Sequence, residues 1–137
     1  MINAIIVDDE PYCCEALSIL LGRYCPQVDV RSSYHSAIDA LGAIREQKPQ
    51  LLFLDIEMPR MNGFEVLRWL KDRADYAYMP KIILSGSSVE EDVAKAYDLG
   101  ANTFFTKPHG VVKFRELMQY VVGYWILSQQ PALHHAA

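Results

Sequence analysis

The stretch LLFLDIEMPRMNG, residues 51–63, decides the fold, because a short and wholly apolar run ends abruptly in an acid. A continuous apolar run of this length, Leu51–Leu54, is typical of a strand that is buried on both faces of a sheet. The carboxylate that follows it, Asp55, is costly to bury unless another group pairs with it. The sequence therefore predicts a buried strand whose acid needs a partner from elsewhere in the chain.

The composition places limits on the class of protein. The chain has 137 residues, of which 51% are hydrophobic, and this size suits one domain with its own core. A net charge of −4 gives no general attraction for nucleic acid or an anionic membrane. No apolar run reaches the ~18 residues of a transmembrane helix, and Met1 leads directly into a strand pattern instead of a signal peptide. We therefore expect a cytoplasmic protein with no direct nucleic acid or membrane binding.

The three cysteines, Cys13, Cys14 and Cys25, do not describe a disulfide framework, because their number is odd and their spacing irregular. The adjacent pair could be redox-active. Neighbouring residues on a helix point in different directions, however, and this favours reduced cysteines with a packing role.

Short apolar runs alternate with helical patterns along the whole chain. Helices are expected from Pro11, after a Ser36 cap, over 64–70, after Ser88 and over Val112–Leu127. The apolar side of the first includes Ala16 with Leu17, Leu20 and Leu21, and that of the fourth includes Val89 with Val93 and Ala96. Strict alternation of this kind predicts an α/β fold, in which a parallel sheet of five strands is covered by helices on both faces. The ligand site of such a fold lies beyond the carboxyl ends of the strands. The expected strands are Ala4–Val7, Val28–Val30, Leu51–Leu54, Ile82–Leu84 and Thr103–Phe105.

Polar side chains follow four of these strands. The first ends in Asp8-Asp9-Glu10, the third in Asp55, the fourth in Ser85 and the fifth in Lys107-Pro108. Any one of them alone would suit a solvated turn or loop, but all four fall at expected strand ends, in order. Converging carboxylates repel one another, and oxygen ligands with no Cys or His nearby suit Mg²⁺. With Lys107 for a phosphoryl oxygen, this set fits phosphoryl transfer with Asp55 as nucleophile.

Four stretches of the sequence resemble the receiver domains of two-component response regulators: IIVDDEP, LLFLDIEMPRMNGFEVL, KIILSGS and LGANTFFTKP. They cover residue 4 to about residue 122. The resemblance implies a doubly wound, flavodoxin-like sheet of order 2-1-3-4-5, with a long C-terminal helix. It also implies a signalling switch that catalyses its own aspartyl phosphorylation and dephosphorylation and is not an enzyme acting on other substrates.

The resemblance assigns roles to individual residues. Asp55 would accept phosphate from the phosphohistidine of a histidine kinase or phosphotransfer protein. Mg²⁺ would be held by Asp8, Asp9, Asp55 and the backbone carbonyl of Glu57. Lys107 would contact the phosphoryl group, in a Lys-Pro bond that is commonly cis in the family.

Further positions follow from the same resemblance. Ser85 and Phe104 would be the switch residues, with the aromatic ring turning inward as the hydroxyl moves to the phosphate. Glu57 and Ser87 stand where the family tunes the lifetime of the phosphate, and the Glu57 carboxylate could meet the metal or Lys107. Met58-Pro59 and Gly63 match the loop after the acceptor, where Pro fixes φ and Gly permits conformations closed to other residues.

For the output of the receiver, we expect a stand-alone, single-domain regulator. The front half resembles receivers attached to LytTR-type DNA-binding domains, whereas the back half resembles single-domain regulators such as those of cyanobacterial phytochromes. We expect a receiver over 1–122 and a helix extension and tail over 123–137, with a fragment of a longer DNA-binding regulator as the alternative. An enzyme of the aspartyl-phosphate class and a pseudo-receiver, which takes no phosphate, are further alternatives. The former would need a cap, and the latter would lack an acid or the lysine.

The last helix carries two apolar stripes. One follows the i, i+3, i+4 spacing of a core-facing surface, from Phe114 to Trp125. The second consists of Tyr120, Tyr124 and Leu127, and aromatic side chains at this density suggest a protein interface. We expect a homodimer through the last helix. The alternative is that the tail folds back over its own domain.

Overall fold

The computed structural model describes residues 2–58, 60–86 and 89–127. Within these residues, no helix combines the length and the apolar character needed to cross a bilayer. The elements, in chain order, are β1 Ile2–Val7, α1 Pro11–Tyr24, β2 Val28–Tyr34, α2 Ala37–Gln47, β3 Leu51–Leu54, α3 Gly63–Lys71, a 3-10 turn at Ala74–Tyr76, β4 Lys81–Ser85, α4 Glu90–Asp98, β5 Thr103–Thr106 and α5 Val111–Leu127.

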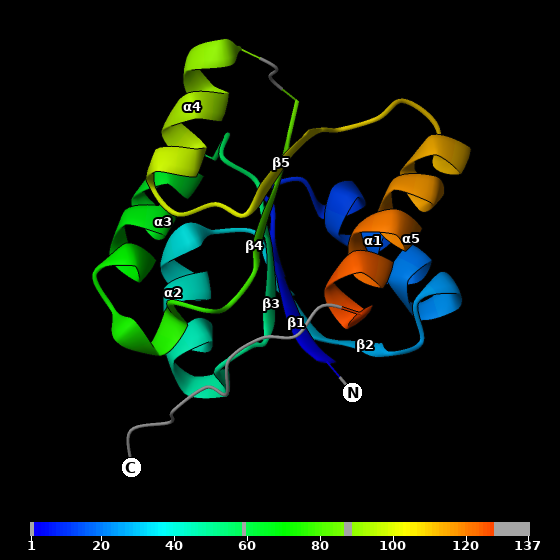
Figure 1. The fold of residues 1–137 in the computed structure, drawn as a ribbon, viewed down its shortest axis with the longest axis horizontal. Helices are drawn as coiled ribbons and strands as arrows, with labels where there is room; N and C mark the ends of the chain where they lie inside the picture. Colours follow the sequence, from blue (N-terminus) through cyan, green and yellow to red (C-terminus); the bar gives the residue numbers. More distant parts are fainter. Residues whose placement is uncertain (1, 59, 87–88, 128–137) are drawn as a thin grey trace.

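All five strands join one parallel sheet in the order β2-β1-β3-β4-β5. Helices α2, α3 and α4 cover one face of the sheet, and α1 and α5 cover the other (Figure 1). The expected α/β class, strand order and double winding are therefore confirmed. All strands point the same way, so the residues after β1, β3, β4 and β5 meet at one edge.

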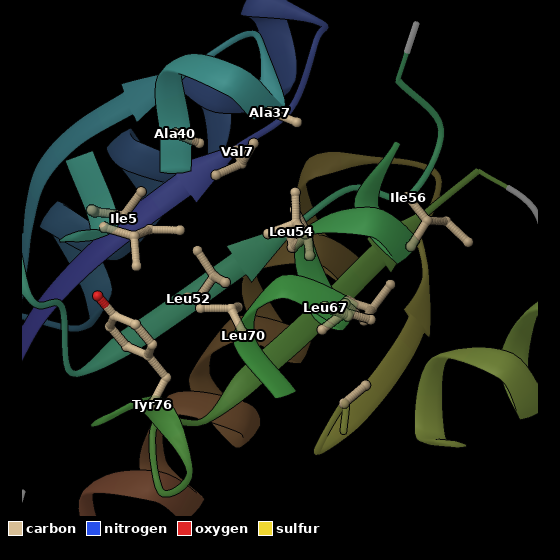
Figure 2. Packing of buried hydrophobic residues seen from close by; sticks show 14 of the residues in the cluster. Ile5, Val7, Ala37, Ala40, Leu52, Leu54, Ile56, Leu67, Leu70 and Tyr76 are labelled. Carbon is tan, nitrogen blue, oxygen red and sulfur yellow. The ribbon is translucent and has the colours of Figure 1, made fainter. Parts of the chain in front are cut away.

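The central strands are buried on both faces, as their unbroken apolar runs predict. Side chains of one parity, such as Ile5, Leu52 and Leu54, pack under α2 and α3 (Figure 2). Side chains of the other parity, such as Ile6 and Phe53, pack under α1 and α5. Burial on both faces leaves the strands no solvent-facing side, so the sheet is a rigid support for groups at its edge.

Three local predictions differ from the structure. β2 continues past Val30 to Tyr34, because this edge strand needs no continuous apolar run and has an irregular register opposite β1. In α1, Cys14 is buried together with three leucines of the helix, while Ala16, expected on the same side as the leucines, is exposed. Val89, expected on the inner side of the fourth helix, is the exposed N-cap of α4, and Ser88 lies outside the described residues.

The sequence pattern does not predict that a lysine is buried at the start of β4. Lys81 begins β4 with 5% of its surface exposed, and its ammonium donates to the carbonyls of Tyr76 and Met79, each at 2.8 Å. Burial lowers the pKa of Lys81 to about 8. The lysine thereby ties the start of β4 to the end of the preceding turn.

The loop after β3 is fixed by its backbone. Asn62 caps α3 by accepting a hydrogen bond from the Glu65 N–H at 3.1 Å, and the Gly63 N–H donates to Ile56 at 3.2 Å. Gly63 does not adopt a positive φ, contrary to the role expected for it. A Cβ at Gly63 would instead lie 2.5 Å from the Asp55 carbonyl oxygen, so glycine is needed for close backbone approach.

Replacing Gly63 by alanine should therefore destabilise the domain by about 2 kcal/mol, because overpacking forces backbone to move. Chemical denaturation measures the change. Gly42→Ala is the matched control, since a Cβ there meets nothing within 4 Å, and the helix should gain about 0.5–1 kcal/mol. If both variants shift stability in the same direction, the steric account of Gly63 is wrong.

Candidate functional site

Three carboxylates meet at the carboxyl edge of the sheet. Asp8 and Asp9 follow β1, and Asp55 follows the adjacent strand β3. One oxygen from each lies within 4.8 Å of the others. Asp8 and Asp55 are buried, with 5% and 3% of their surfaces exposed, while Asp9 is half-buried. The predicted convergence of these acids is therefore observed.

The backbone around the acids holds them in place. The Asp8 N–H donates to the Tyr34 carbonyl at 3.0 Å, and the Asp55 N–H donates to the Val7 carbonyl at 2.9 Å. Each buried acid also accepts a hydrogen bond from the backbone two residues later: Glu10 N–H to Asp8 Oδ1 at 2.9 Å, and Glu57 N–H to Asp55 Oδ1 at 3.1 Å. These bonds fix one oxygen of each carboxylate and leave Oδ2 directed at the site.

Lys107 is the cation that faces both buried acids. Its Nζ lies 2.8 Å from Asp8 Oδ2 and 3.7 Å from Asp55 Oδ2. Its own N–H donates to the Ser85 carbonyl at 2.7 Å, which extends the β4–β5 pairing beyond the strands and aims the side chain across the sheet edge. Lys107 therefore partners Asp55, as expected, but it pairs more closely with Asp8.

Negative charges outnumber positive charges among the described side chains of the acidic pocket. Burial raises the pKa of Asp55 well above the ordinary range, and the charges of Asp8 and Asp9 add to this, against the Glu57 N–H and Lys107. Burial alone would lower the pKa of Lys107, but its hydrogen bond to Asp8 and the attraction of Asp55 outweigh burial and raise it. One ammonium thus faces two buried carboxylates, with the carboxylate of Asp9 close to both.

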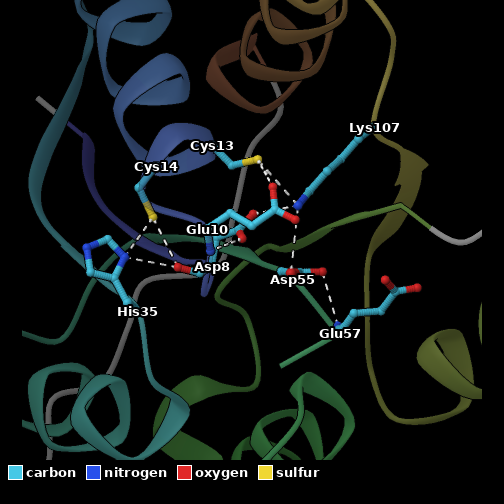
Figure 3. A network of polar contacts seen from close by, with 8 residues as sticks. All are labelled: Asp8, Glu10, Cys13, Cys14, His35, Asp55, Glu57 and Lys107. Carbon is cyan, nitrogen blue, oxygen red and sulfur yellow. Dashed lines mark hydrogen bonds and ion pairs between the residues drawn. The ribbon is translucent and has the colours of Figure 1, made fainter. Parts of the chain in front are cut away.

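The donor set fits a hard divalent cation. Carboxylate oxygens within reach of one another, two of them buried and underneutralised, are the ligands that Mg²⁺ prefers, with water completing its shell. Asp8, Asp9 and Asp55 would hold the ion. The Glu57 side chain is exposed, and Figure 3 draws no contact between its carboxylate and Lys107.

The two residues expected to act as switches lie on the adjacent strands β4 and β5. Ser85 is fully buried at the end of β4, and Phe104 on β5 is half-buried and packs against the cluster under α2, α3 and α4. The expected cis bond at Lys107-Pro108 is not observed, since no cis peptide occurs among the described residues. Trans is the isomer that such a bond favours by about 0.5–1 kcal/mol. Ser87 lies outside those residues.

Sequence reasoning missed the thiols and the imidazole beside the site (Figure 3). Cys14, in the first turn of α1, has its Sγ 3.4 Å from the Asp8 carbonyl oxygen, and His35, directly after β2, has its Nδ1 3.1 Å from the same oxygen. Cys13 Sγ lies 3.6 Å from Lys107 Nζ. The expectation that no Cys or His lies near the acids is therefore wrong. Adjacent residues on a helix do diverge, as expected, but these two diverge to opposite sides of Asp8.

The residues expected at an interface lie on the outer side of α5. Tyr120 and Tyr124 are exposed by 77% and 63%, and the side chain of Leu127 lies outside the described part of the chain. Phe114, Leu117, Met118, Val121 and Val122 pack inward as expected. A shallow groove of about 480 Å³ runs between β5 and α5, lined by Thr103, Phe105, Leu117, Tyr120, Val121 and Tyr124.

Solved structures share this fold. RcpA, a cyanobacterial phytochrome response regulator solved in phosphorylated form, matches with a TM-score of 0.82 at 21% identity, covering 96% of this chain and 99% of its own. RPA3017, a response regulator in red light signaling of R. palustris, matches with a TM-score of 0.83 at 22% identity and the same coverage. At these identities the likeness concerns the fold alone.

Sequence comparison identifies the family. An uncharacterized response regulatory protein of Shewanella oneidensis is 37% identical over 108 residues, which are 79% of this chain and 43% of that protein. The chain thus spans less than half of this relative. The family model of the response regulator receiver domain matches residues 4–121. The chain therefore belongs to the receiver domains of response regulators, the signalling switches of two-component systems.

Proposed function

We propose that Asp55 accepts a phosphoryl group, in a Mg²⁺-dependent reaction, from the phosphohistidine of a histidine kinase or phosphotransfer protein. The observation that carries this proposal is the pairing of Asp8 and Asp55, both buried, with Lys107 at 2.8 and 3.7 Å. An acid with this burial and only one shared cation is poised to bind positive charge and, with it, a phosphoryl group. The phosphoryl group would switch contacts with other proteins in the cytoplasm.

The geometry suggests how the residues divide the work. Asp55 Oδ1 is engaged by the Glu57 N–H, so Oδ2 is the oxygen that attacks phosphorus while the phosphorus–nitrogen bond of the donor breaks. The departing imidazole keeps the electron pair and takes a proton from water. Mg²⁺, held by Asp8, Asp9 and Asp55 with the Glu57 carbonyl, would offset the repulsion between carboxylate and phosphate.

Lys107 and the switch residues would respond to the new charge. The ammonium now shared by Asp8 and Asp55 can move to a phosphoryl oxygen when a cation takes over Asp8. Because the Lys107 N–H is bound to the Ser85 carbonyl, this movement is tied to the end of β4. We propose that the side chains of Ser85 and Phe104 rearrange in response and so alter the surface formed by α4 and β5.

Asp55→Asn should abolish phosphorylation, because the amide cannot form the acyl phosphate. Incubation with acetyl phosphate and Mg²⁺, followed by mass spectrometry, should add one phosphoryl group to the wild-type protein and none to the variant. EDTA should suppress the wild-type reaction by more than tenfold. A wild-type protein that takes up neither phosphate nor the phosphoryl mimic beryllofluoride would instead be a pseudo-receiver.

The raised pKa of Asp55 predicts a pH dependence of the metal-free protein. Below about pH 4 the acid is protonated in the folded and the unfolded chain alike. Above that pH the unfolded chain loses this proton while the folded chain keeps it up to its higher pKa, so stability falls between the two pKa values and then levels off. Asp55→Asn has no such proton, so its stability relative to wild type should increase toward pH 8, by about 1–3 kcal/mol.

Urea denaturation in EDTA, at several pH values between about 4 and 8, measures this difference. Near pH 8, saturating Mg²⁺ should reduce or reverse the stability difference between Asp55→Asn and wild type, because the ion binds the wild-type site more tightly than the variant site. A difference that is constant across the window would contradict the buried, undercompensated state of Asp55.

We also propose that two copies of the chain associate through α5. The support is the groove between β5 and α5, with the exposed rings of Tyr120 and Tyr124 beside it. Tyrosine supplies large contact area at low entropic cost, and a second copy would bring the same rings to the same groove. Leu127 belongs to this proposal by its spacing alone.

Light scattering with Mg²⁺, with and without beryllofluoride, tests the association. The wild-type protein should be dimeric in at least one state, and the double variant Tyr120→Ser, Tyr124→Ser should bind its copy about 10- to 100-fold more weakly. Tyr12→Ser is the control, because Tyr12 is 86% exposed on α1 and is not part of the groove. A wild-type monomer in both states would exclude the dimer.

A further inference from the structure

The first turn of α1 connects the N-terminus of that helix with the site lysine. Cys13 is the third helical residue, and its Sγ donates a hydrogen bond to the Glu10 carboxylate at 3.2 Å. The same sulfur accepts a hydrogen bond from Lys107 Nζ at 3.6 Å. A chain of contacts therefore runs from Lys107 through Cys13 to Glu10, across the rim of the acidic pocket (Figure 3).

The three contacts of Lys107 Nζ differ in chemistry. Asp8 and Asp55 are charged, and both change role in the proposed reaction, one as a metal ligand and the other as the acceptor. The Cys13 sulfur is uncharged and takes no part in metal binding or in the transfer. Burial, followed by the hydrogen bond to Glu10, raises the pKa of the Cys13 thiol to about 11, so the thiol keeps its proton at neutral pH.

We propose that Cys13 is a positioning residue for Lys107. Its sulfur holds the ammonium at the rim of the pocket when a cation engages Asp8, so that Lys107 meets the incoming phosphoryl oxygens. This inference rests on the proposed function, because it assigns a partner to the lysine of the same site. Glu10 completes the arrangement by accepting a hydrogen bond from the thiol, which turns a sulfur lone pair toward Lys107.

The other two thiols have different partners and serve as references. Cys14 contacts the Asp8 carbonyl and His35, on the opposite side of Asp8 from Lys107. Cys25 is buried against α5, with its Sγ 4.0 Å from the Met118 carbonyl oxygen. Neither contact reaches Lys107, so only Cys13 should influence phosphoryl binding through the lysine.

Cys13→Ala and Cys13→Ser separate hydrogen bonding from packing. With saturating Mg²⁺, Cys13→Ala should bind beryllofluoride about fivefold more weakly and react with acetyl phosphate correspondingly more slowly, a change of about 1 kcal/mol. Cys13→Ser should remain within about twofold of wild type, since a hydroxyl can accept from Lys107 and donate to Glu10. The affinity for Mg²⁺ should stay within about twofold in both variants, because no ligand is removed.

A double-mutant cycle tests whether Cys13 acts through the lysine. In a Lys107→Ala background, Cys13→Ala should cause no further loss of beryllofluoride affinity. Cys25→Ala is the control for removing a thiol elsewhere, and should leave beryllofluoride binding unchanged even if it lowers the stability of the fold. Cys13→Val, which fills a similar volume without the hydrogen bond, should behave like Cys13→Ala and replaces it if the alanine variant folds poorly.

The inference would be overturned if Cys13→Ala or Cys13→Val kept wild-type beryllofluoride affinity, or if Cys13→Ala caused an equal loss with and without Lys107. An equal loss in Cys13→Ser and Cys13→Ala would also do so, because hydrogen bonding would then not be the cause. All of these are distinct from failure of the proposed function, in which the wild-type protein itself would bind no beryllofluoride.

Discussion

The site depends on one electrostatic constraint: two carboxylates, Asp8 and Asp55, are buried at the ends of adjacent parallel strands. The backbone N–H groups of Asp8 and Asp55 donate to the carbonyls of Tyr34 and Val7, and these bonds continue the hydrogen bonding of the sheet. The two acids therefore cannot move apart. Lys107 reaches both but cannot neutralise both, and Asp9 adds a further negative charge. The folded protein therefore carries an uncompensated charge that a cation would relieve.

Because of this constraint, neutralising the acids would change the contacts at the carboxyl edge of the sheet. In the proposed function, a cation that neutralises the acids would free Lys107 from Asp8, and the backbone N–H of this lysine is bonded to the Ser85 carbonyl. β5, which ends just before Lys107, also carries Thr103 and Phe105 in the groove beside α5. A chemical event at the acids and a protein contact at α5 thus share one short edge strand, which is the element through which the two could be coupled.

The sequence predicts those features that follow from strand ends. Unbroken apolar runs locate β1, β3 and β4, and parallel connection then brings Asp8, Asp55 and Lys107 to one edge. Other features depend on tertiary contacts that no local pattern carries. Gly63 is required by its approach to the Asp55 carbonyl, and its own backbone conformation gives no sign of this. His35 reaches Asp8 only because β2 extends beyond its apolar start.

Few types of side chain are suited to position 13, because they must lie between Glu10 and Lys107 at the rim of the pocket. A small thiol is one of them. A carboxylate beside Lys107 would add to the charge that already raises the pKa of Asp55, while a cation would repel Lys107. An aliphatic side chain would leave the ammonium with the two acids alone. A neutral, polarisable group that both donates to Glu10 and accepts from Lys107 avoids all three conflicts. Cys14 does pack into the core under α1 and α5, as expected, whereas the place of Cys13 is better explained by the charges that surround it.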